Sequence, residues 1–341
     1  MKIKDILQIK YGKNQSSVID KNGKYPIIGT GGIFGYATKY LYNKPSVLIG
    51  RKGSINNPMY VDTPFWTVDT LFYTIIDTSK VIPRWFYYYI STLNLNKFNE
   101  GTTIPSLTTK TLYEIDVPEH SLNYQQHIVD IIGSIDDKIE NNNKIIEKFN
   151  NLLKIKTNEL LLYKTKKIQL NDIIEECKEK TDIELTPYSV VNTGKVIIQN
   201  EQFNKEIAKN IKGKYKKIKK DFFVYNPSRI NIGSIGMMED EIGCVSPIYI
   251  AFKCSEEYKI YLLQLLTFEF MIKEINKRCS GSVRQALPFK DLCSIEIYDI
   301  ERDKLKLYNK YCENIIRTAK KLEEENLKLQ QLKNNYLAKF F

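Results

Sequence analysis

Two long stretches of the chain place apolar residues at alternating steps of four and three, the first over residues 128–160 and the second over residues 308–336. This spacing is the a/d rhythm of a coiled coil and predicts two long helices, each with one apolar seam. No proline occurs over residues 119–180. The first helix can therefore extend over about 40 residues, or about 60 Å at 1.5 Å per residue. The second seam repeats the first at an offset of 180 residues, so the two helices share one register.

The two seams define a set of candidate helix-pairing residues. They are Ile128, Ile135, Ile139, Asn142, Ile146, Phe149 and Leu153 in the first helix and Ile315, Leu322, Asn326, Leu329 and Tyr336 in the second. The matched register, similar length and Lys/Glu flanks favour pairing of the two helices with each other. The alternative is that each amphipathic helix packs on its own domain. If the helices pair, the polar positions Asn142 and Asn326 fix their register at some cost in stability.

The segments before the two helices have a different pattern. Short apolar runs such as PSVLIG, TLFYTII, DFFVYN and SPIYIAF are separated by Gly, Pro, Asn and Asp, which predicts strands and turns. RWFYYYISTLNLNKF and KIYLLQLLTFEFMIKEINK are more helical. The predicted fold class is α+β, with two similar domains separated by two long helices. Its predicted parts are a globular domain at 1–120, a long helix at 121–166, a globular domain at 167–300 and a long helix at 301–341.

The two globular segments are related in sequence. GTTIPSLTTKTLYEIDV lies over GSVRQALPFKDLCSIEI at an offset of 180, and the same offset aligns the Gly-Ser-Ile tripeptides that begin at Gly53 and Gly233. TVDTLFYTI lies over CVSPIYIAF at an offset of 177. Several matches in the same order predict two copies of one unit of roughly 165 to 180 residues, which is an internal repeat with a pseudo-twofold relation.

The composition is that of a globular, basic protein. Of the 341 residues, 43% are hydrophobic and 27% charged. No apolar run approaches the roughly 18–20 residues that span a bilayer. The start, MKIKDILQIKYGKNQ, lacks a signal-peptide pattern, so we expect a cytoplasmic protein with no membrane partner. The net charge of +11 favours a polyanionic partner, nucleic acid before membrane, although part of the lysine excess is also typical of AT-rich genomes.

Sequence motifs for catalysis or metal binding are missing. The six cysteines form no C-x-x-C pair, which makes a zinc site improbable. GTGGIFG (29–35) has Phe34 where a dinucleotide-binding loop needs its third glycine, so we interpret it as a tight turn between strands. IIEECKEK resembles a nuclease motif but is interpreted as part of a Lys- and Glu-rich helix. No phosphate loop, nucleophile elbow or Asn/Asp-Pro-Pro-aromatic tetrapeptide occurs. We therefore expect a chain that is not itself an enzyme and binds no metal or cofactor.

The order of these features resembles one family. The two-copy layout, YPIIGTGGIFGY, VLIGRKGSINN, YNPSRINIGSIG, and GTTIPSLTTKTLYEIDVP before the long helix are similar to the specificity subunit of type I restriction-modification systems. The resemblance implies that each globular domain is a target-recognition domain. It also implies that the helices pair antiparallel and dock methyltransferase subunits.

The resemblance further implies a set of partners. They are double-stranded DNA, two methyltransferase subunits and, in the full complex, two restriction subunits. S-adenosylmethionine is expected in the methyltransferase, which would modify adenine N6 on a flipped base. Because the two copies have diverged, we expect the recognised DNA sequence to be split and asymmetric. A helix pair about 60 Å long would separate its halves by more than one turn of roughly 34 Å.

Loops that precede or contain glycines supply the candidate DNA-binding residues. They are Arg51, Lys52, Ser54, Thr102 and Thr103 in the first copy and Arg229, Asn231, Ser234, Ser282, Arg284 and Gln285 in the second. Arg suits guanine and Asn suits adenine by paired hydrogen bonds. The alternatives are phosphate contact and a purely structural turn, and the latter is favoured for the two serines after Gly53 and Gly233.

In the second copy, a basic run, KNIKGKYKKIKK, precedes the loop that carries Arg229. It is interpreted as a strand with one solvated lysine face, and Lys214, Lys216 and Lys217 are its candidates for neutralising DNA phosphates. A solvated surface strand without such a role is the equal alternative.

Two other functions remain possible. A stand-alone DNA-binding protein would bind specific DNA without methyltransferase partners. A nuclease would cleave DNA with magnesium and lose activity when Glu175 or Glu176 is replaced.

Overall fold

The computed structural model describes residues 1–199, 211–279 and 286–341, which form two compact units. Unit 1 consists of Met1–Asn143 and Glu323–Phe341, and unit 2 consists of Lys144–Leu322. Each unit therefore combines one globular segment with a part of both long helices.

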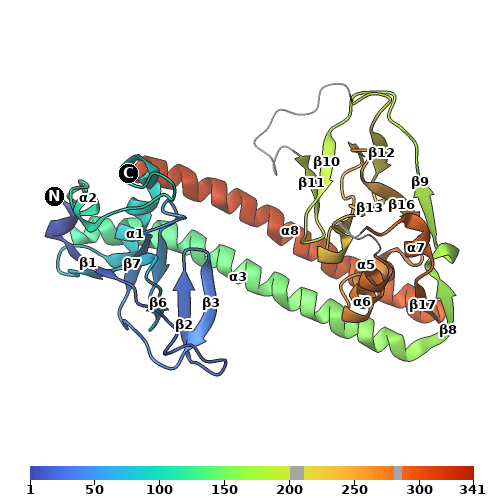
Figure 1. Ribbon diagram of the computed structural model, residues 1–341, viewed down its shortest axis with the longest axis horizontal. Coiled ribbons are helices and arrows are strands. Elements are labelled where there is room, and N and C mark those ends of the chain that lie inside the picture. The colour runs from blue at the N-terminus through green and yellow to red at the C-terminus, as the bar shows by residue number, and fades with distance from the viewer. Residues whose placement is uncertain (200–210, 280–285) are drawn as a thin grey trace. The chain divides into compact units, whose positions relative to one another are not determined.

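Unit 1 contains two small sheets and four α-helical segments, and Figure 1 shows its strands and helices. Its four-stranded sheet has the order β1-β7-β4-β5 with all neighbours antiparallel, and its three-stranded sheet has the order β3-β2-β6. The strands are β1 (Leu7–Tyr11), β2 (Tyr25–Gly29), β3 (Gly32–Ala37), β4 (Ser46–Gly50), β5 (Met59–Val61), β6 (Trp66–Thr67) and β7 (Leu71–Ile76). The helices are η1 (Ile3–Asp5), α1 (Pro83–Thr92), η2 (Leu95–Phe98), α2 (Thr109–Tyr113), the first part of α3 (Leu122–Leu160) and the last part of α8 (Arg302–Phe340).

The hydrophobic pattern explains the core of unit 1. Strand β4 is buried at every position, which accounts for the uninterrupted apolar run that predicts it. Helix α1 begins with Pro83, at a position where a missing N–H costs nothing. Its residues Trp85, Phe86 and Tyr88 are fully buried against the four-stranded sheet. The sheet and this helix are the scaffold that carries the loops of unit 1.

Unit 2 contains three sheets and the remaining helices. Their orders are β14-β13-β16-β9, β11-β10-β15-β12 and β17-β8. The strands are β8 (Lys164–Gln169), β9 (Ile174–Cys177), β10 (Pro187–Val190), β11 (Val196–Ile198), β12 (Lys216–Lys219), β13 (Phe223–Tyr225), β14 (Ile235–Met237), β15 (Ile242–Val245), β16 (Ile250–Cys254) and β17 (Glu296–Ile300). The helices in the described part of unit 2 are the last part of α3, η3 (Leu161–Tyr163), η4 (Leu170–Asp172), η5 (Ile230–Ile232), α5 (Lys259–Leu265), α6 (Glu269–Arg278), α7 (Phe289–Cys293) and the first part of α8 (Arg302–Phe340).

The predicted internal repeat is visible in the sheet topology. Strands β9, β16, β13 and β14 pair in the same order as β1, β7, β4 and β5, and every pair is antiparallel in both units. In the second sheet, β10 pairs antiparallel with β11 and parallel with β15, as β2 does with β3 and β6. The prediction of two similar α+β units is confirmed, and unit 2 adds strand β12 beside β15 and the two-stranded sheet of β17 and β8.

The two long helices pair antiparallel, as predicted. Each has 39 residues. In unit 1, Asp136 of α3 forms an ion pair of 2.6 Å with Lys333 of α8, and Asn142 donates to Asn326 at 2.9 Å. In unit 2, the hydroxyls of Thr157 and Tyr308 lie 2.7 Å apart. The residue numbers rise along one helix as they fall along the other.

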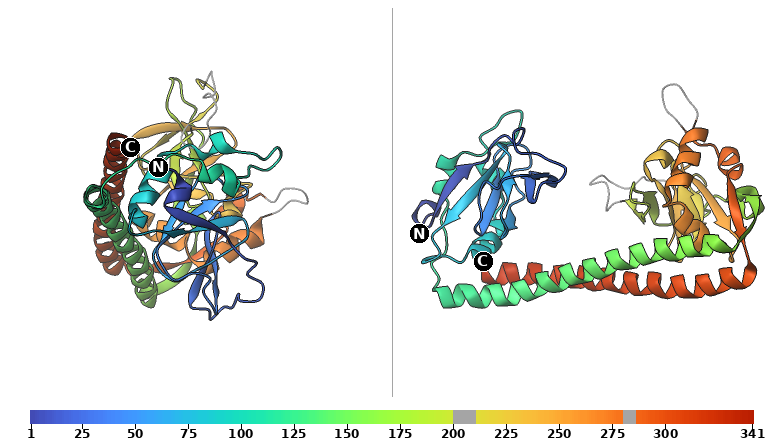
Figure 2. Two further views of the ribbon diagram at one scale, coloured as in Figure 1. Left: turned by 90° about the vertical axis from the view of Figure 1, so that its left-hand side faces the viewer. Right: turned by 90° about the horizontal axis from the view of Figure 1, so that it is seen from below.

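The helices also pack on the globular parts, so the two alternatives left open by the sequence are both realised. In unit 1, the C-terminal end of α8 lies beside the globular part (Figure 2). Tyr336, Leu337 and Phe340 of α8 join the core beside α1, and the Phe341 ring lies 5.5 Å from Trp85. Asp136 of α3 accepts a 2.8 Å hydrogen bond from Tyr88 of α1, and burial together with this carboxylate raises the pKa of Tyr88. The same part of the chain thus belongs to the helix pair and to the domain.

One local prediction is wrong. IIEECKEK is not part of a helix, because Ile174–Cys177 forms strand β9 and pairs with β16. Sheet pairing overrides the weak helix preference of Glu and Lys at this point. KIYLLQLLTFEFMIKEINK is helical, as predicted, and forms α5 and α6. None of the helices in the described part of the chain has the length and apolarity needed to cross a membrane.

Candidate nucleic-acid interface

The repeated Gly-Ser-Ile tripeptide forms the same tight turn in both units. Gly53 has φ +85° and Gly233 has φ +92°, a conformation that L side chains rarely adopt. The Ile55 N–H donates to the Gly53 carbonyl at 2.9 Å, and the Ile235 N–H donates to the Gly233 carbonyl at 2.8 Å. The repeated glycine is therefore required by the backbone of the turn.

In unit 1, this turn lies beside the second predicted loop. The Gly53 N–H donates to the Pro105 carbonyl, and the Leu107 N–H donates to the Arg51 carbonyl, both at 2.9 Å. Lys52, Ser54, Thr102 and Thr103 are all exposed. The fold therefore brings the five candidate residues of unit 1 onto two adjacent loops, although they lie about 50 residues apart in the chain.

Arg51 has a fixed position within this pair of loops. Its Nη1 donates to the Asp69 carbonyl at 2.9 Å, and its guanidinium lies 5.2 Å from the centre of the Tyr11 ring. No carboxylate lies within ion-pair distance of Arg51 among the described residues. Because an arginine has five N–H donors, Arg51 retains donors for a further partner. Sequence reasoning missed Tyr11 and Asp69, because no local motif marks them as neighbours of Arg51.

The loop with Thr102 and Thr103 is held by hydrogen bonds from one side chain. The Asn99 Oδ1 atom accepts from the N–H groups of Gly101 and Ser106, at 2.9 and 2.8 Å. A Cβ atom at Gly101 would lie only 2.0 Å from the Ile104 carbonyl oxygen, so this position needs glycine. The loop therefore has a defined shape and presents Thr102 and Thr103 to solvent.

The corresponding residues of unit 2 differ in exposure. Arg229 is exposed and Asn231 is half-buried. Ser234 is only 1% exposed, and its hydroxyl donates to the Val190 carbonyl at 2.9 Å. This serine holds two segments of unit 2 together, which agrees with the structural role favoured for it and leaves its side chain no access to DNA. Ser54, at the same place in unit 1, is exposed.

The second predicted loop of unit 2 is only partly described. Ser282, Arg284 and Gln285 lie outside the described residues. The Leu287 N–H, which follows them, donates to the Pro227 carbonyl at 3.1 Å. This bond corresponds to the one between Leu107 and Arg51 in unit 1, so the chain that follows the second loop lies beside the first in both units.

Residues 209 and 210 of the basic run lie outside the described residues, and Lys216–Lys219 of the run form strand β12. Lys216 donates to the Tyr249 carbonyl at 2.7 Å, and burial lowers its pKa. Lys217 forms an ion pair of 3.0 Å with Glu179. Lys214 and Lys219 are exposed. Two of the strand's lysines therefore bond within the unit, whereas Lys214 and Lys219 remain open to solvent.

The candidate helix-pairing residues are buried or half-buried in both units. Unit 1 holds Ile128, Ile135, Ile139, Asn142, Asn326, Leu329 and Tyr336, and unit 2 holds Ile146, Phe149, Leu153, Ile315 and Leu322. Ile128 is part of the globular core of unit 1. Asn142 is 1% exposed and donates to Asn326 and to Glu325, both at 2.9 Å. Asn326 donates in turn to Asn143 at 2.9 Å, so the polar seam positions bond each other.

The acidic residues considered for a nuclease site do not form one in the described structure. Glu175 and Glu176 are adjacent on strand β9, so their side chains point to opposite faces of the sheet. Glu176 forms an ion pair of 2.9 Å with Lys178. Within residues 1–199, 211–279 and 286–341, no three His, Cys, Asp or Glu side chains gather in a way that could hold a metal ion.

The chain is similar to known specificity subunits. Residues 1–151 match the family model of the type I restriction modification DNA specificity domain. A 115-residue segment is 29% identical to the type I restriction enzyme MjaIX specificity subunit of Methanocaldococcus jannaschii. That match covers 32% of this chain and only 26% of the relative.

A solved structure extends the similarity over the whole fold. The crystal structure of the type I restriction-modification system S subunit from M. genitalium aligns with 100% of this chain and 95% of its own, at a TM-score of 0.66 and 16% identity. At this identity the alignment shows a shared fold. Residues 1–151 thus match the type I DNA specificity domain model, and the whole chain shares the fold of a type I S subunit, which confirms the resemblance.

Proposed function

We propose that this chain is the DNA sequence-specificity subunit of a type I restriction-modification complex and that each unit reads one half of a split, asymmetric DNA site. The observation that carries the proposal is the repeated unit itself. Two sheets of the same strand order each carry a glycine turn, and in unit 1 a second loop lies beside this turn. A duplicated reader suits a two-part DNA site. The different exposed residues on the two copies suit two different halves.

In unit 1, Arg51 is the strongest candidate for base recognition. Its anchoring by Asp69 and Tyr11 lowers the entropy lost when the guanidinium binds, and arginine pairs with the O6 and N7 atoms of guanine. Lys52, Thr102 and Thr103 are exposed beside it and suit phosphate contacts, which position a protein without selecting sequence. In unit 2, Arg229 and Asn231 take the corresponding roles.

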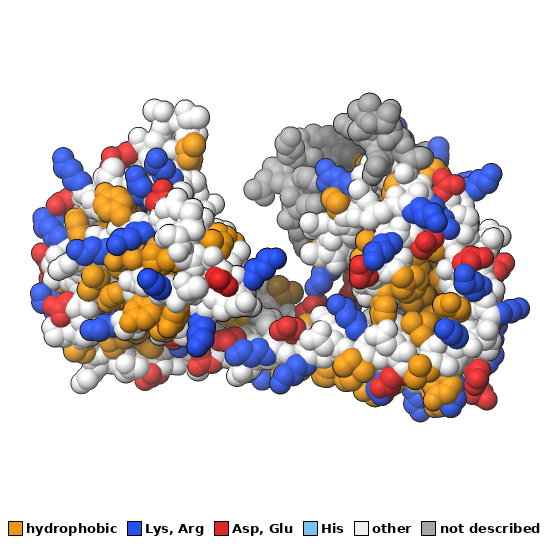
Figure 3. Space-filling model, turned by 60° about the horizontal axis from the view of Figure 1, so that its bottom comes forward, with side chains coloured by type: hydrophobic (Ala, Val, Ile, Leu, Met, Phe, Trp, Pro, Cys, Tyr) orange, Lys and Arg blue, Asp and Glu red, His pale blue; other side chains and the backbone are white. Residues whose placement is uncertain are grey.

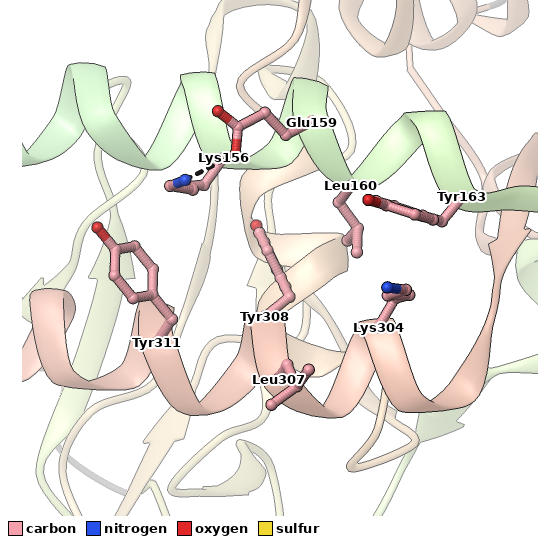
Figure 4. Close-up of a pocket in the computed structure, with 8 residues that line it drawn as sticks. All are labelled: Lys156, Glu159, Leu160, Tyr163, Lys304, Leu307, Tyr308 and Tyr311. Carbon is pink, nitrogen blue, oxygen red and sulfur yellow. Dashed lines mark hydrogen bonds and ion pairs between the residues drawn. The ribbon is translucent and has the colours of Figure 1, made fainter.

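The chain is proposed to be non-catalytic and to direct two methyltransferase subunits, with two restriction subunits in the full complex. S-adenosylmethionine would bind to the methyltransferase rather than to this chain. A surface on the helix pair of unit 2 supports partner docking (Figure 4). It is a cavity of about 310 Å³ lined by Lys156, Glu159, Leu160, Tyr163, Lys304, Leu307, Tyr308 and Tyr311.

The composition of this cavity suits a protein partner. Leu307 is 66% exposed, and the Lys304 ammonium lies 4.5 Å from the centre of the Tyr163 ring. Aromatic side chains in an exposed apolar groove are typical of protein interfaces. We therefore expect replacement of Leu307 by Glu to weaken co-purification of the methyltransferase without unfolding the chain.

The test of the function is a map of N6-methyladenine in host DNA, with the gene intact, deleted or restored. Loss of one split motif on deletion, and its return with the wild-type gene, would support the proposal. Restoration with R51A should relax one half of the motif at one position, because a paired arginine–guanine contact discriminates by about 1–3 kcal/mol. An unchanged map on deletion would refute the role in methylation.

Two further outcomes distinguish the alternatives. Specific DNA binding by the purified chain, with affinity unchanged when the methyltransferase is added, would favour a stand-alone DNA-binding protein. Magnesium-dependent cleavage that is lost in E175A or E176A would favour a nuclease.

A further inference from the structure

The hairpin of β2 and β3 in unit 1 carries two adjacent apolar side chains that face solvent. Ile27 pairs with Gly35 and Ile28 pairs with Ile33, so Phe34 is the extra residue of a β-bulge. Ile33 is 59% exposed and Phe34 is 53% exposed. A regular strand would turn one of two consecutive side chains inward, whereas a bulge redirects them. The bulge therefore accounts for both being exposed.

The end of this hairpin is narrow. Cβ atoms added at Gly31 and Gly32 would meet no atom within 4 Å, and Gly32 has φ +104°. A Cβ atom at Gly29 would lie 3.2 Å from the edge of the Phe34 ring, so the ring rests against this glycine. The glycines of GTGGIFG thus leave a slim tip next to two large apolar side chains, and this shape fits a groove.

The corresponding hairpin of unit 2 is not free in this way. A Cβ atom at Gly194, beyond the end of β10, would lie 3.0 Å from the Ile235 carbonyl oxygen. A Cβ atom at Gly236 would lie only 1.9 Å from the Gly194 carbonyl oxygen. The turn of β10 and β11 therefore packs against β14. The exposed apolar tip belongs to unit 1 alone among the two described hairpins.

The tip is continuous with the loop that carries Arg51. The Val68 N–H donates to the Ile28 carbonyl of β2 at 3.3 Å. The next residue, Asp69, accepts the 2.9 Å hydrogen bond from Arg51. The hairpin and the loop that carries Arg51 therefore lie on either side of Val68 and Asp69. A single ligand can contact the hairpin and this loop at once.

The charge around the hairpin identifies the kind of ligand. Residues 10–44 contain six lysines and one aspartate, a net charge of +5. The lysines are Lys10, Lys13, Lys21, Lys24, Lys39 and Lys44, all exposed. In the described part of the chain none of the six takes part in an ion pair. Figure 3 shows hydrophobic and basic side chains side by side on unit 1. Such a surface matches duplex DNA, whose phosphates attract lysine and whose grooves accept apolar side chains.

We infer that the β2–β3 hairpin enters a groove of the DNA and that Ile33 and Phe34 determine part of the half-site read by unit 1 through apolar contacts with base edges, such as the thymine methyl group. This inference rests on the proposed function. It names a contact outside the loops around Gly53 and Gly101, and it makes recognition by unit 1 different in kind from recognition by unit 2.

The test uses the complete complex of this chain with its methyltransferase and a library of randomised DNA duplexes. The I33S/F34S variant should enrich a motif in which one half has lost preference at one or two positions, with about tenfold weaker binding to the wild-type motif. F34L, which keeps an apolar contact, should retain most of the preference. L122S is the matched control, because Leu122 is an exposed apolar residue of unit 1 on α3. R229A in unit 2 should alter the other half of the motif and so assign the halves to the units.

The outcomes separate the inference from the function on which it rests. Both substituted residues are more than half exposed, so the substitutions should leave unit 1 folded. Unchanged tryptophan fluorescence would verify this. F34S alone is a milder second variant. An identical motif and affinity for wild type and I33S/F34S would overturn the inference alone. Loss of the methyltransferase from I33S/F34S with intact DNA preference would also overturn it, because the tip would then be a protein interface. No enriched motif with the wild-type complex would overturn the proposed function and the inference together.

Discussion

The buried asparagines of the helix pair allow a quantitative test of how α3 and α8 are held in unit 1. N142A removes two hydrogen bonds, to Asn326 and to the Glu325 carboxylate, both at 2.9 Å. A neutral hydrogen bond contributes about 0.5–1.5 kcal/mol and one to a charged group about 1.5–3 kcal/mol. Water can replace part of this at the half-buried Glu325 and Asn326, and alanine gains about 0.5 kcal/mol in helix propensity. The expected net loss is about 1–3 kcal/mol.

The second half of the cycle tests whether the two asparagines act together. N326A removes the bond shared with Asn142 and the bond to Asn143, so a loss of about 1 kcal/mol is expected. Because both single variants remove the same shared bond, the double variant should be less destabilised than the sum by about 1 kcal/mol. N142L/N326L should regain stability by making the seam apolar, at the expense of a defined register.

The assay is urea unfolding followed by tryptophan fluorescence. The only tryptophans, Trp66 and Trp85, both lie in unit 1, so the signal reports the unit that contains these asparagines. N141A is the matched control, since Asn141 is exposed on the same helix and should be neutral or stabilising by up to about 0.5 kcal/mol. Strict additivity in the cycle, or an N142A variant as stable as N141A, would refute the reasoning.

Two further predictions concern other parts of the chain. Lys4 and Lys2, each 2.9 Å from Glu114, lower the pKa of this carboxyl from 4.5 to about 2. The stabilisation of unit 1 by these ion pairs is therefore present above pH 4.5 and is lost as the pH falls towards 2. E114Q should destabilise unit 1 at pH 6 and match the wild type near pH 2, and an equal difference in stability at both pH values would contradict this origin. On α3 in unit 2, Leu153 is 4% exposed and Ile155 is 54% exposed. L153A should therefore lower the stability of unit 2 by about 2–5 kcal/mol, and I155A by less than about 0.5 kcal/mol. Hydrogen exchange of unit 2 peptides measures both losses, and equal effects would contradict the assigned seam.

The long-range organisation could be predicted because it leaves regular signals in the sequence. A heptad seam and a repeat at a constant offset are periodic signals. The seam predicts the two long helices, and the repeat predicts that the two units share their sheet arrangement. The tight turns at Gly53 and Gly233 were also predictable, because positive φ restricts the residue type there. The helices, the repeated units and the glycine turns each follow from a sequence pattern that occurs in both copies.

The chemistry of individual side chains could not be predicted, because it depends on partners distant in the sequence. Ser54 and Ser234 occupy the same position of the same turn, yet one is exposed and the other bonds Val190. Lys216 and Lys217 lie in a run that suggests a uniform charged face, but Tyr249 and Glu179 accept from them. The position of Arg51 over Tyr11 likewise depends on sheet pairing that no motif encodes.

If each unit reads one half-site, as proposed, the contrast between the two hairpins gives one scaffold two different reading surfaces. The strands that build the sheets of the two units pair in the same order, so the loops leave each unit at corresponding places. What differs is whether a loop packs back on its own sheet. The turn of β10 and β11 is occupied by contact with β14, whereas the turn of β2 and β3 has no such contact and presents Ile33 and Phe34. Under the inference above, releasing a tip from the sheet would change the surface offered to DNA without changing the strand order that positions both tips. Divergence between the copies should accordingly be greatest at such tips and least at the glycine turns.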